Sequence, residues 1–180
     1  LDGFVSFDKE QKWTPAACDD VAGKFLSAAK EQESATNRAF PEAIYNAGLA
    51  YQRCGQDDKA RSQFQAAADA DKGFHRARAQ LALYDYKKSG NLDGAIQALD
   101  QVIRDAKFQN VEALVALAAL QMERGNDQPN PDGKNDLERA KLNLQRALAI
   151  DDSYMPAFNQ LALYYLEAAK ASAEKQAGAK

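Results

Sequence analysis

Two cysteines offer the clearest chemistry in this sequence. Cys18 and Cys54 are its only cysteines, and each falls in a segment with the apolar spacing of a helix. The turn between these segments is centred near residue 36, which places the thiols 18 residues before and 18 residues after it. Residues at equal distances from the turn of an antiparallel helix pair lie side by side, so the two thiols can form a disulfide. Two buried free thiols are the alternative, because cysteine is among the residue types most often buried.

The two alternatives predict different compartments. A disulfide persists in an oxidising environment, which for a bacterial protein means the periplasm or another extracytoplasmic space, whereas free thiols are typical of the cytoplasm. A catalytic or metal-binding role for either cysteine would need a histidine or an acid cluster close to it. The one histidine, His75, falls in a later helix pair, so we predict neither role.

Residues 126–139, which are rich in asparagine, aspartate and glycine, have some features of a calcium-binding loop. If Gly133 is the turn glycine, the first ligand position falls on Gln128 and the closing acid on Arg139. Neither side chain suits a hard cation, so we predict no metal site. A solvated loop is the simpler interpretation, and a loop that contacts a protein partner is the alternative. The sequence has no glycine-rich phosphate loop and no nucleophile elbow, so we expect no enzyme, no catalytic residue and no cofactor.

The composition favours an all-α protein. Valine, isoleucine and threonine together occupy only eleven of the 180 positions, and these β-branched residues are the usual components of strands. The net charge is -3, and lysines and arginines are scattered among acids instead of forming a basic stripe, so we expect no nucleic-acid binding. No apolar run approaches the roughly 20 residues that cross a bilayer, so we predict no membrane-spanning segment.

An internal repeat organises these helices. Four segments, residues 41–55, 76–90, 111–125 and 155–169, share apolar residues at spacings of three and four. Each has a small residue near its middle, where a partner helix can approach closely: Gly48, Ala82, Ala118 and Ala162. The first three are each followed by a second helix with three residues on one face. These trios are Ala60, Phe64 and Ala67; Ala95, Leu99 and Val102; and Ala140, Leu144 and Ala147.

This pattern resembles the tetratricopeptide repeat (TPR), over roughly residues 41–170. Gly55, Gly90 and Gly125 stand where the first helices should end in a left-handed residue. Repeat three departs from the pattern by a ten-residue insertion, residues 126–135, and the proline that often separates repeats is absent. The resemblance implies a right-handed α-solenoid of helix-turn-helix repeats.

We therefore divide the chain into five parts. Residues 1–40 form an N-terminal extended segment and a capping helix, which starts at Thr14 and Pro15 and runs to about Gln32. In the extended part, Phe4, Phe7 and Trp13 are available to lie on the first helices. Residues 41–74, 75–110 and 111–154 form TPR repeats 1, 2 and 3. Residues 155–180 form a terminal helix, either a half repeat or a cap.

By analogy with the TPR family, the functional surface is the concave face that the first helices line. The inward positions hold mostly apolar residues, which suit an extended peptide or an amphipathic helix of a partner. They are Tyr45, Leu49 and Gln52; Ala79, Leu83 and Tyr86; Val115, Ala119 and Met122; and Asn159, Leu163 and Leu166. Chaperone-binding TPR domains hold a peptide carboxylate with lysines, asparagines and arginines at such positions. Tyr45, Ala79 and Val115 stand there instead, so we predict no carboxylate clamp.

The resemblance implies a non-catalytic scaffold or adaptor that binds a protein partner in its groove, within a larger multiprotein assembly. The alternative is self-association, as a structural component of a cell-envelope machine. In style the sequence resembles TPR proteins of bacterial gliding motility, pilus assembly or secretion. A TPR fold alone does not identify the partner.

Overall fold

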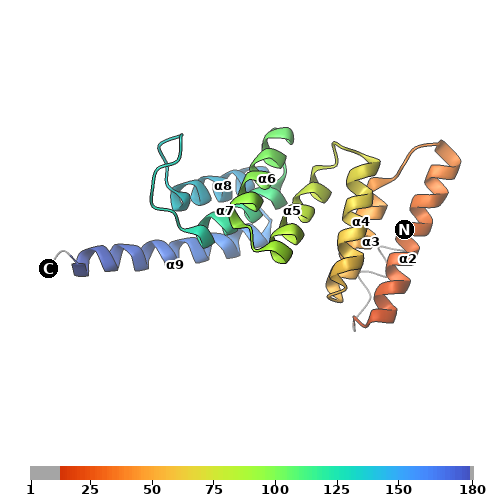
Figure 1. Ribbon diagram of the computed structural model, residues 1–180, viewed down its shortest axis with the longest axis horizontal. Helices are drawn as coiled ribbons and strands as arrows, with labels where there is room; N and C mark the ends of the chain where they lie inside the picture. Colours follow the sequence, from red (N-terminus) through yellow and green to blue (C-terminus); the bar gives the residue numbers. More distant parts are fainter. Residues whose placement is uncertain (1–12, 179–180) are drawn as a thin grey trace. The chain divides into compact units, whose positions relative to one another are not determined.

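The computed structural model describes residues 13–178, and all regular elements in this part of the chain are helices, without strands (Figure 1). The all-α prediction is confirmed. The helices are α2 (Pro15–Thr36), α3 (Pro41–Arg53), α4 (Asp57–Ala70), α5 (His75–Ser89), α6 (Leu92–Asp105), α7 (Val111–Arg124), α8 (Asp136–Ile150) and α9 (Met155–Gly178). Phe4 and Phe7, which we expected to lie on the first helices, fall outside the described residues.

The chain separates into two compact units, Leu1–Lys88 and Ser89–Lys180. In the first unit α3 packs against both α2 and α4 (Figure 1). In the second unit α7 packs against α6, α8 and α9. The boundary falls at the end of α5, inside the segment 75–110 that we predicted as one repeat, so this repeat assignment stays a prediction.

The helix ends follow local capping rules. Thr14 accepts a hydrogen bond from the Ala17 N–H (3.2 Å), and Pro15 occupies the first turn of α2, as predicted. Gly55, Gly90 and Gly125 all have the expected left-handed backbone, with φ between 58° and 70°. Helix α2 runs to Thr36, four residues beyond the predicted end, because its C-cap is Asn37, which adopts φ 52° where a glycine would be usual.

The core of the first unit centres on Phe64 of α4. Its ring is fully buried and lies 5.3 Å from the ring of Tyr45 and 5.8 Å from that of Tyr84, measured between centroids. The α3 backbone passes directly over this ring at Gly48. A Cβ atom on Gly48 would come within 2.6 Å of Phe64 Cε1, so a glycine is required for this approach.

A disulfide between Cys18 and Cys54 joins α2 to the end of α3, with 6.5 Å between the Cα atoms. Beside it, Val21 and Phe25 of α2 pack on the small residues Ala47 and Ala50 of α3. Trp13 is half-buried against this cluster, and the Arg53 guanidinium lies 5.4 Å from its ring centroid.

The second unit repeats the small-against-large packing. Ala118 of α7 meets Ala140 and Leu144 of α8, and Tyr164 of α9 joins the same cluster. All nine residues of the predicted second-helix trios, in both units, are buried. Of the four small residues in the first helices, Gly48, Ala82 and Ala118 are buried and Ala162 is exposed.

Replacing Gly48 with alanine tests the contact with Phe64. The added methyl group gains about 1 kcal/mol of helix propensity but overpacks a buried ring, which costs about 1–3 kcal/mol. Because the aromatic neighbours of Phe64 leave its ring no room to move, we expect Gly48→Ala to lower the free energy of unfolding. The matched control is Gly23→Ala in α2, where a Cβ atom meets nothing within 4 Å and should stabilise the unit. Urea unfolding measures the change in the free energy of unfolding for both variants. A Gly48→Ala variant that is more stable than the native chain would contradict this packing.

Removing the disulfide should destabilise the first unit. The bond closes a loop with a sequence separation of 36. On the chain-entropy model, losing it lowers the free energy of unfolding by about 3–4 kcal/mol. We expect this loss in the double variant Cys18→Ser, Cys54→Ser and equally in the reduced native protein, measured by urea unfolding. Equal stability of the oxidised and reduced protein would contradict the expectation.

Candidate protein-binding site

A pocket of about 280 Å³ opens in the first unit among α3, α5 and the start of α4. Its lining combines polar side chains with one aliphatic and one aromatic residue: Gln52, Asp57, Gln80, Leu83, Tyr84 and Lys87. The volume lies just below the roughly 300–1,000 Å³ that is usual for small-molecule sites. A pocket of this size suits one or two side chains of a bound peptide.

Polar contacts join the two sides of the pocket. Gln52 Nε2 of α3 donates to Gln80 Oε1 of α5 (3.3 Å), and this pair of amides is exposed to solvent. At another point the Lys87 ammonium forms an ion pair with the Asp57 carboxylate. Burial, and then the nearby Asp57 carboxylate, raise the pKa of the Tyr84 hydroxyl.

The pocket depends on the packing of α5 against α4. Tyr84 is buried against Phe64, so one residue is part of both the core and the pocket lining. On the same side, Arg61 of α4 forms an exposed ion pair with Asp85 of α5 (2.7 Å). An exposed pair of this kind contributes little stability, at most about 1 kcal/mol, so the aromatic contact is the main anchor.

Of the inward positions predicted in the first unit, Gln52 and Leu83 line this pocket. Tyr45 and Ala79 do not, because their exposed fractions are only 1% and 3%. Tyr45 is covered because Phe74, in the turn after α4, packs edge-on against its ring at 5.5 Å. Leu49 and Tyr86 are half-buried, and Leu49 packs against the Phe64 cluster.

Ala79 is buried because the buried face of α5 is wide. The buried residues of this helix are Ala77, Ala79, Ala82 and Tyr84, which spread over more than one stripe. The prediction for Ala79 used a single helical period, and this residue therefore lies in the core instead of the groove.

In the second unit, the inward positions predicted on α7 are only half-exposed. Val115 and Met122 pack against the cluster around Leu144, and Ala119 is half-buried. Met122 Sδ also accepts a hydrogen bond from Gln160 Nε2 of α9 (3.6 Å). The three positions predicted on α9, Asn159, Leu163 and Leu166, are all exposed.

Four of the six named pocket residues, Asp57, Gln80, Tyr84 and Lys87, escaped the sequence prediction. Asp57 stands in the first turn of α4, where acids are favoured by the helix dipole, so its sequence position gave no sign of a site. Lys87 and Gln80 are ordinary surface residues of a helix. A search for an acid and a base on adjacent helices would have found Asp57 and Lys87, but only with the helix packing known.

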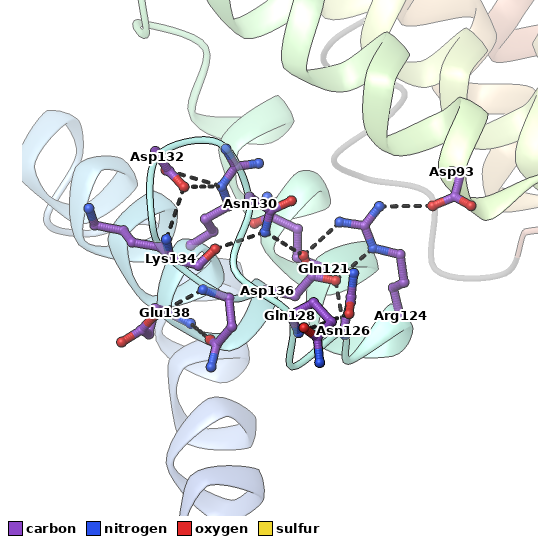
Figure 2. A network of polar contacts seen from close by, with 12 residues as sticks. Asp93, Gln121, Arg124, Asn126, Gln128, Asn130, Asp132, Lys134, Asp136 and Glu138 are labelled. Atoms are coloured by element: carbon purple, nitrogen blue, oxygen red, sulfur yellow. Dashed lines mark hydrogen bonds and ion pairs between the residues drawn. The ribbon is translucent and has the colours of Figure 1, made fainter.

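The inserted segment between α7 and α8 is held by a buried carboxylate (Figure 2). Asp136 is fully buried, and its two oxygens accept bonds from Arg124 Nε and a terminal guanidinium nitrogen, both at 2.6 Å. The Asn126 N–H (3.1 Å) and Asn130 Nδ2 (3.2 Å) also donate to it. Arg124 reaches Asp93 of α6 through its remaining terminal nitrogen (2.8 Å). Two ion pairs of Arg124, with Asp93 and Asp136, therefore tie α6, α7 and α8 together, and the hydrogen bonds to Asp136 add the insertion.

The outer part of the insertion is a closed turn. Asn130 donates from its backbone N–H to the Lys134 carbonyl (2.8 Å). The Asp132 carboxylate accepts from Arg139 Nε with both oxygens (3.1 Å) and from the Lys134 N–H (3.2 Å) (Figure 2). Arg139, which stands at the acid position of the rejected calcium loop, thus binds an acid itself. Among the described residues, no group of three or more His, Cys, Asp or Glu side chains could hold a metal ion. Over the same part of the chain, none of the helices has the length and hydropathy of a bilayer span.

Acid should weaken the Asp136 network. Burial alone would raise the pKa of the Asp136 carboxyl, but the bonds from Arg124, Asn126 and Asn130 outweigh it and hold the pKa below its ordinary value. This stabilisation is complete above the unfolded-state pKa of about 3.9 and is lost as the pH falls through the lower folded-state pKa. We expect Asp136→Asn to cost about 2–3 kcal/mol near pH 7, because it leaves Arg124 without its main partner, and to flatten the acid dependence.

Hydrogen exchange in α7 and α8 across this pH range measures both effects. The matched control is Asp132→Asn in the same insertion, which removes an exposed carboxylate and should cost less than about 1 kcal/mol. Equal losses of stability in Asp136→Asn and Asp132→Asn would show that Asp136 does not hold the inserted segment.

Comparisons with known proteins agree on the fold. No protein-family model matches the sequence, and no curated protein shows significant similarity to it. Among solved structures, the first TPR of Spaghetti (RPAP3), bound to the HSP90 peptide SRMEEVD, superposes with a TM-score of 0.53 at 18% identity, over 72% of this chain and 93% of that one. MamA from Desulfovibrio magneticus RS-1 (residues 41 to the end) gives 0.52 at 18% identity, over 88% and 81%. Another MamA crystal structure gives 0.52 at 16% identity, over 88% and 86%. This chain therefore has the all-α helical-repeat fold of TPR domains.

Proposed function

We propose that this chain is a non-catalytic scaffold that binds an extended segment of a protein partner in the pocket between α3 and α5. The observation that carries the proposal is the pocket itself. It lies between two first helices of the repeat pattern and brings together Gln52 and Leu83, two of the residues predicted from the sequence to face a partner.

The chemistry of the pocket suits a peptide backbone with an apolar side chain. The exposed amides of Gln52 and Gln80 each offer a donor and an acceptor, which is what the N–H and C=O groups of an extended segment need. Leu83 supplies apolar surface beside them, and the small exposed part of Tyr84 (8%) adds to it. Because Lys87 is already paired with Asp57, the pocket has no strong preference for an acidic segment.

The comparison with RPAP3 supports peptide binding, since a TPR domain of similar fold holds the peptide SRMEEVD. The residues of this chain point to a different peptide class. Tyr45 and Ala79, which occupy clamp positions, are buried and carry no positive charge. We therefore propose that the partner contributes an internal, mostly uncharged segment instead of a C-terminal carboxylate.

We also propose that the chain works outside the cytoplasm, in a multiprotein assembly of the cell envelope. The disulfide between Cys18 and Cys54 supports this location, because such bonds are rare in the reducing cytoplasm. Thiol titration of the denatured protein, taken from its native source without reduction, distinguishes a cystine from two free thiols.

A random peptide library displayed on phage tests peptide binding directly. We expect the chain to select peptides with an apolar residue in an uncharged context, with dissociation constants of about 1–100 μM. Gln80→Ala, which leaves the amide of Gln52 without its neighbour, should weaken their binding about 5–30-fold, and Leu83→Glu should weaken it further by placing a charge on the apolar surface.

The matched control is Ile150→Glu on α8, which puts the same charge on an exposed aliphatic residue of the second unit. Circular dichroism confirms that each variant is folded. Selected peptides whose affinity is the same for Gln80→Ala, Leu83→Glu and Ile150→Glu would refute the assignment of the site to this pocket.

A further inference from the structure

Helix α9 has two apolar faces, and only one of them is packed. On the inner face, Tyr164 is buried and Leu161 and Ala168 are half-buried against the cluster around Ala118 and Leu144. The spacing of these α9 residues, three and then four, defines a single stripe. The exposed side of the helix carries a second apolar stripe.

The outer face carries most of the highly exposed large apolar side chains of the described residues. The exposed fractions are 62% for Met155, 43% for Phe158, 55% for Tyr165 and 52% for Leu166. Leu163 is also exposed (51%), but it lies about 100° from Ala162 around the helix axis and is outside this face. The four side chains, of roughly 200 Å² each and about half exposed, together with the exposed Ala162 and Ala169 present on the order of 500 Å². A patch of this size is at the upper end of what monomeric proteins expose, about 300–600 Å², and such patches are often interaction sites.

The pattern of this face is symmetric about Ala162. Phe158 and Leu166 stand four residues before and after Ala162, and Met155 and Ala169 stand seven residues before and after it. All five residues are exposed. When two such helices cross in opposite directions at Ala162, Phe158 of each meets Leu166 of the other, and Met155 meets Ala169. The small residue at the crossing allows the two backbones to approach closely.

We propose that a second copy of this chain covers the outer face of α9, in a two-fold dimer whose helices cross antiparallel at Ala162. A two-fold interface brings the same patch together from both subunits, so it requires a face that is complementary to itself, as this one is. The nearby charges do not oppose the contact. Glu167 and Lys170 form an ion pair within their own helix (2.7 Å), so neither brings an unpaired charge to the interface.

The available area is sufficient for a specific dimer. Two patches on the order of 500 Å² bury on the order of 1,000 Å² in total, which reaches the roughly 1,000 Å² that a biological interface needs. The outer face of α9 and the peptide pocket share no residues, because α9 belongs to the second unit and the pocket belongs to the first. The interface therefore adds self-association to the proposed binding of a partner.

Sedimentation equilibrium of the whole chain, from about 1 μM to about 1 mM, measures the dimer directly. We expect a monomer–dimer equilibrium that Leu166→Glu weakens about 100-fold or more, because the two-fold places each substitution in the interface twice. The matched control, Ile150→Glu, adds the same charge to an exposed aliphatic residue of α8 and should leave the dissociation constant within about twofold. A chain that stays monomeric over this range, or a dimer that is equally strong with Leu166→Glu, overturns the proposal.

A cysteine at the crossing point tests the geometry. With Cys18 and Cys54 joined, Ala162→Cys introduces the one free thiol of the chain. In the proposed dimer the two new thiols face each other at a distance that a disulfide can span, so mild oxidation should yield a covalent dimer. The control is Ala149→Cys, an exposed position on α8. Crosslinking of Ala162→Cys at least about tenfold faster than that of the control supports the two-fold contact, and equal rates overturn it.

Discussion

The close contact between the α3 backbone and the Phe64 ring is the constraint on which the first unit depends. An amphipathic helix of 13 or 14 residues is marginal alone, so α3 and α4 persist because each buries the apolar side of its neighbour. Gly48 allows the two backbones to approach, and the aromatic ring of Phe64 fills the space between them. Ala118 opposite Leu144 applies the same small-against-large rule in the second unit.

Function follows from this packing through Tyr84. Because Phe64 anchors Tyr84, the position of α5 relative to α3 is set by the core, and the two amides that form the rim of the pocket belong to these helices. The pocket is therefore built on helices, which hold binding groups more firmly than loops do. The insertion before α8 is ordered by polar contacts instead of apolar packing. It has little apolar surface of its own, and the buried Asp136 carboxylate holds it through hydrogen bonds.

The sequence predicted what depends on local period and capping. The second-helix trios were predicted because their spacing of four and three places them on one face. The glycine C-caps were predicted because few other residues adopt the left-handed backbone angles of a helix end. It failed where contacts come from outside the helix. Tyr45 has the right period for the groove, but Phe74 packs over it. We made no prediction for Asp136, because its bond to Arg124 depends on how α7 and α8 pack. Of the residues that line the pocket, Gln52 and Leu83 follow from the repeat, whereas Gln80 and Lys87 depend on the packing of α5, and their role in binding stays a prediction.

The most direct test of this account is a double-mutant cycle between Gly48 and Phe64, followed by urea unfolding. If the two residues are held at their closest approach, Phe64→Leu removes the ring atoms that an alanine at position 48 would meet. We expect that Gly48→Ala destabilises the native chain but is neutral or stabilising when Leu replaces Phe64, with a coupling energy of at least about 1 kcal/mol. Additive effects of the two substitutions would contradict it, since they would show that the glycine and the ring do not set each other's position.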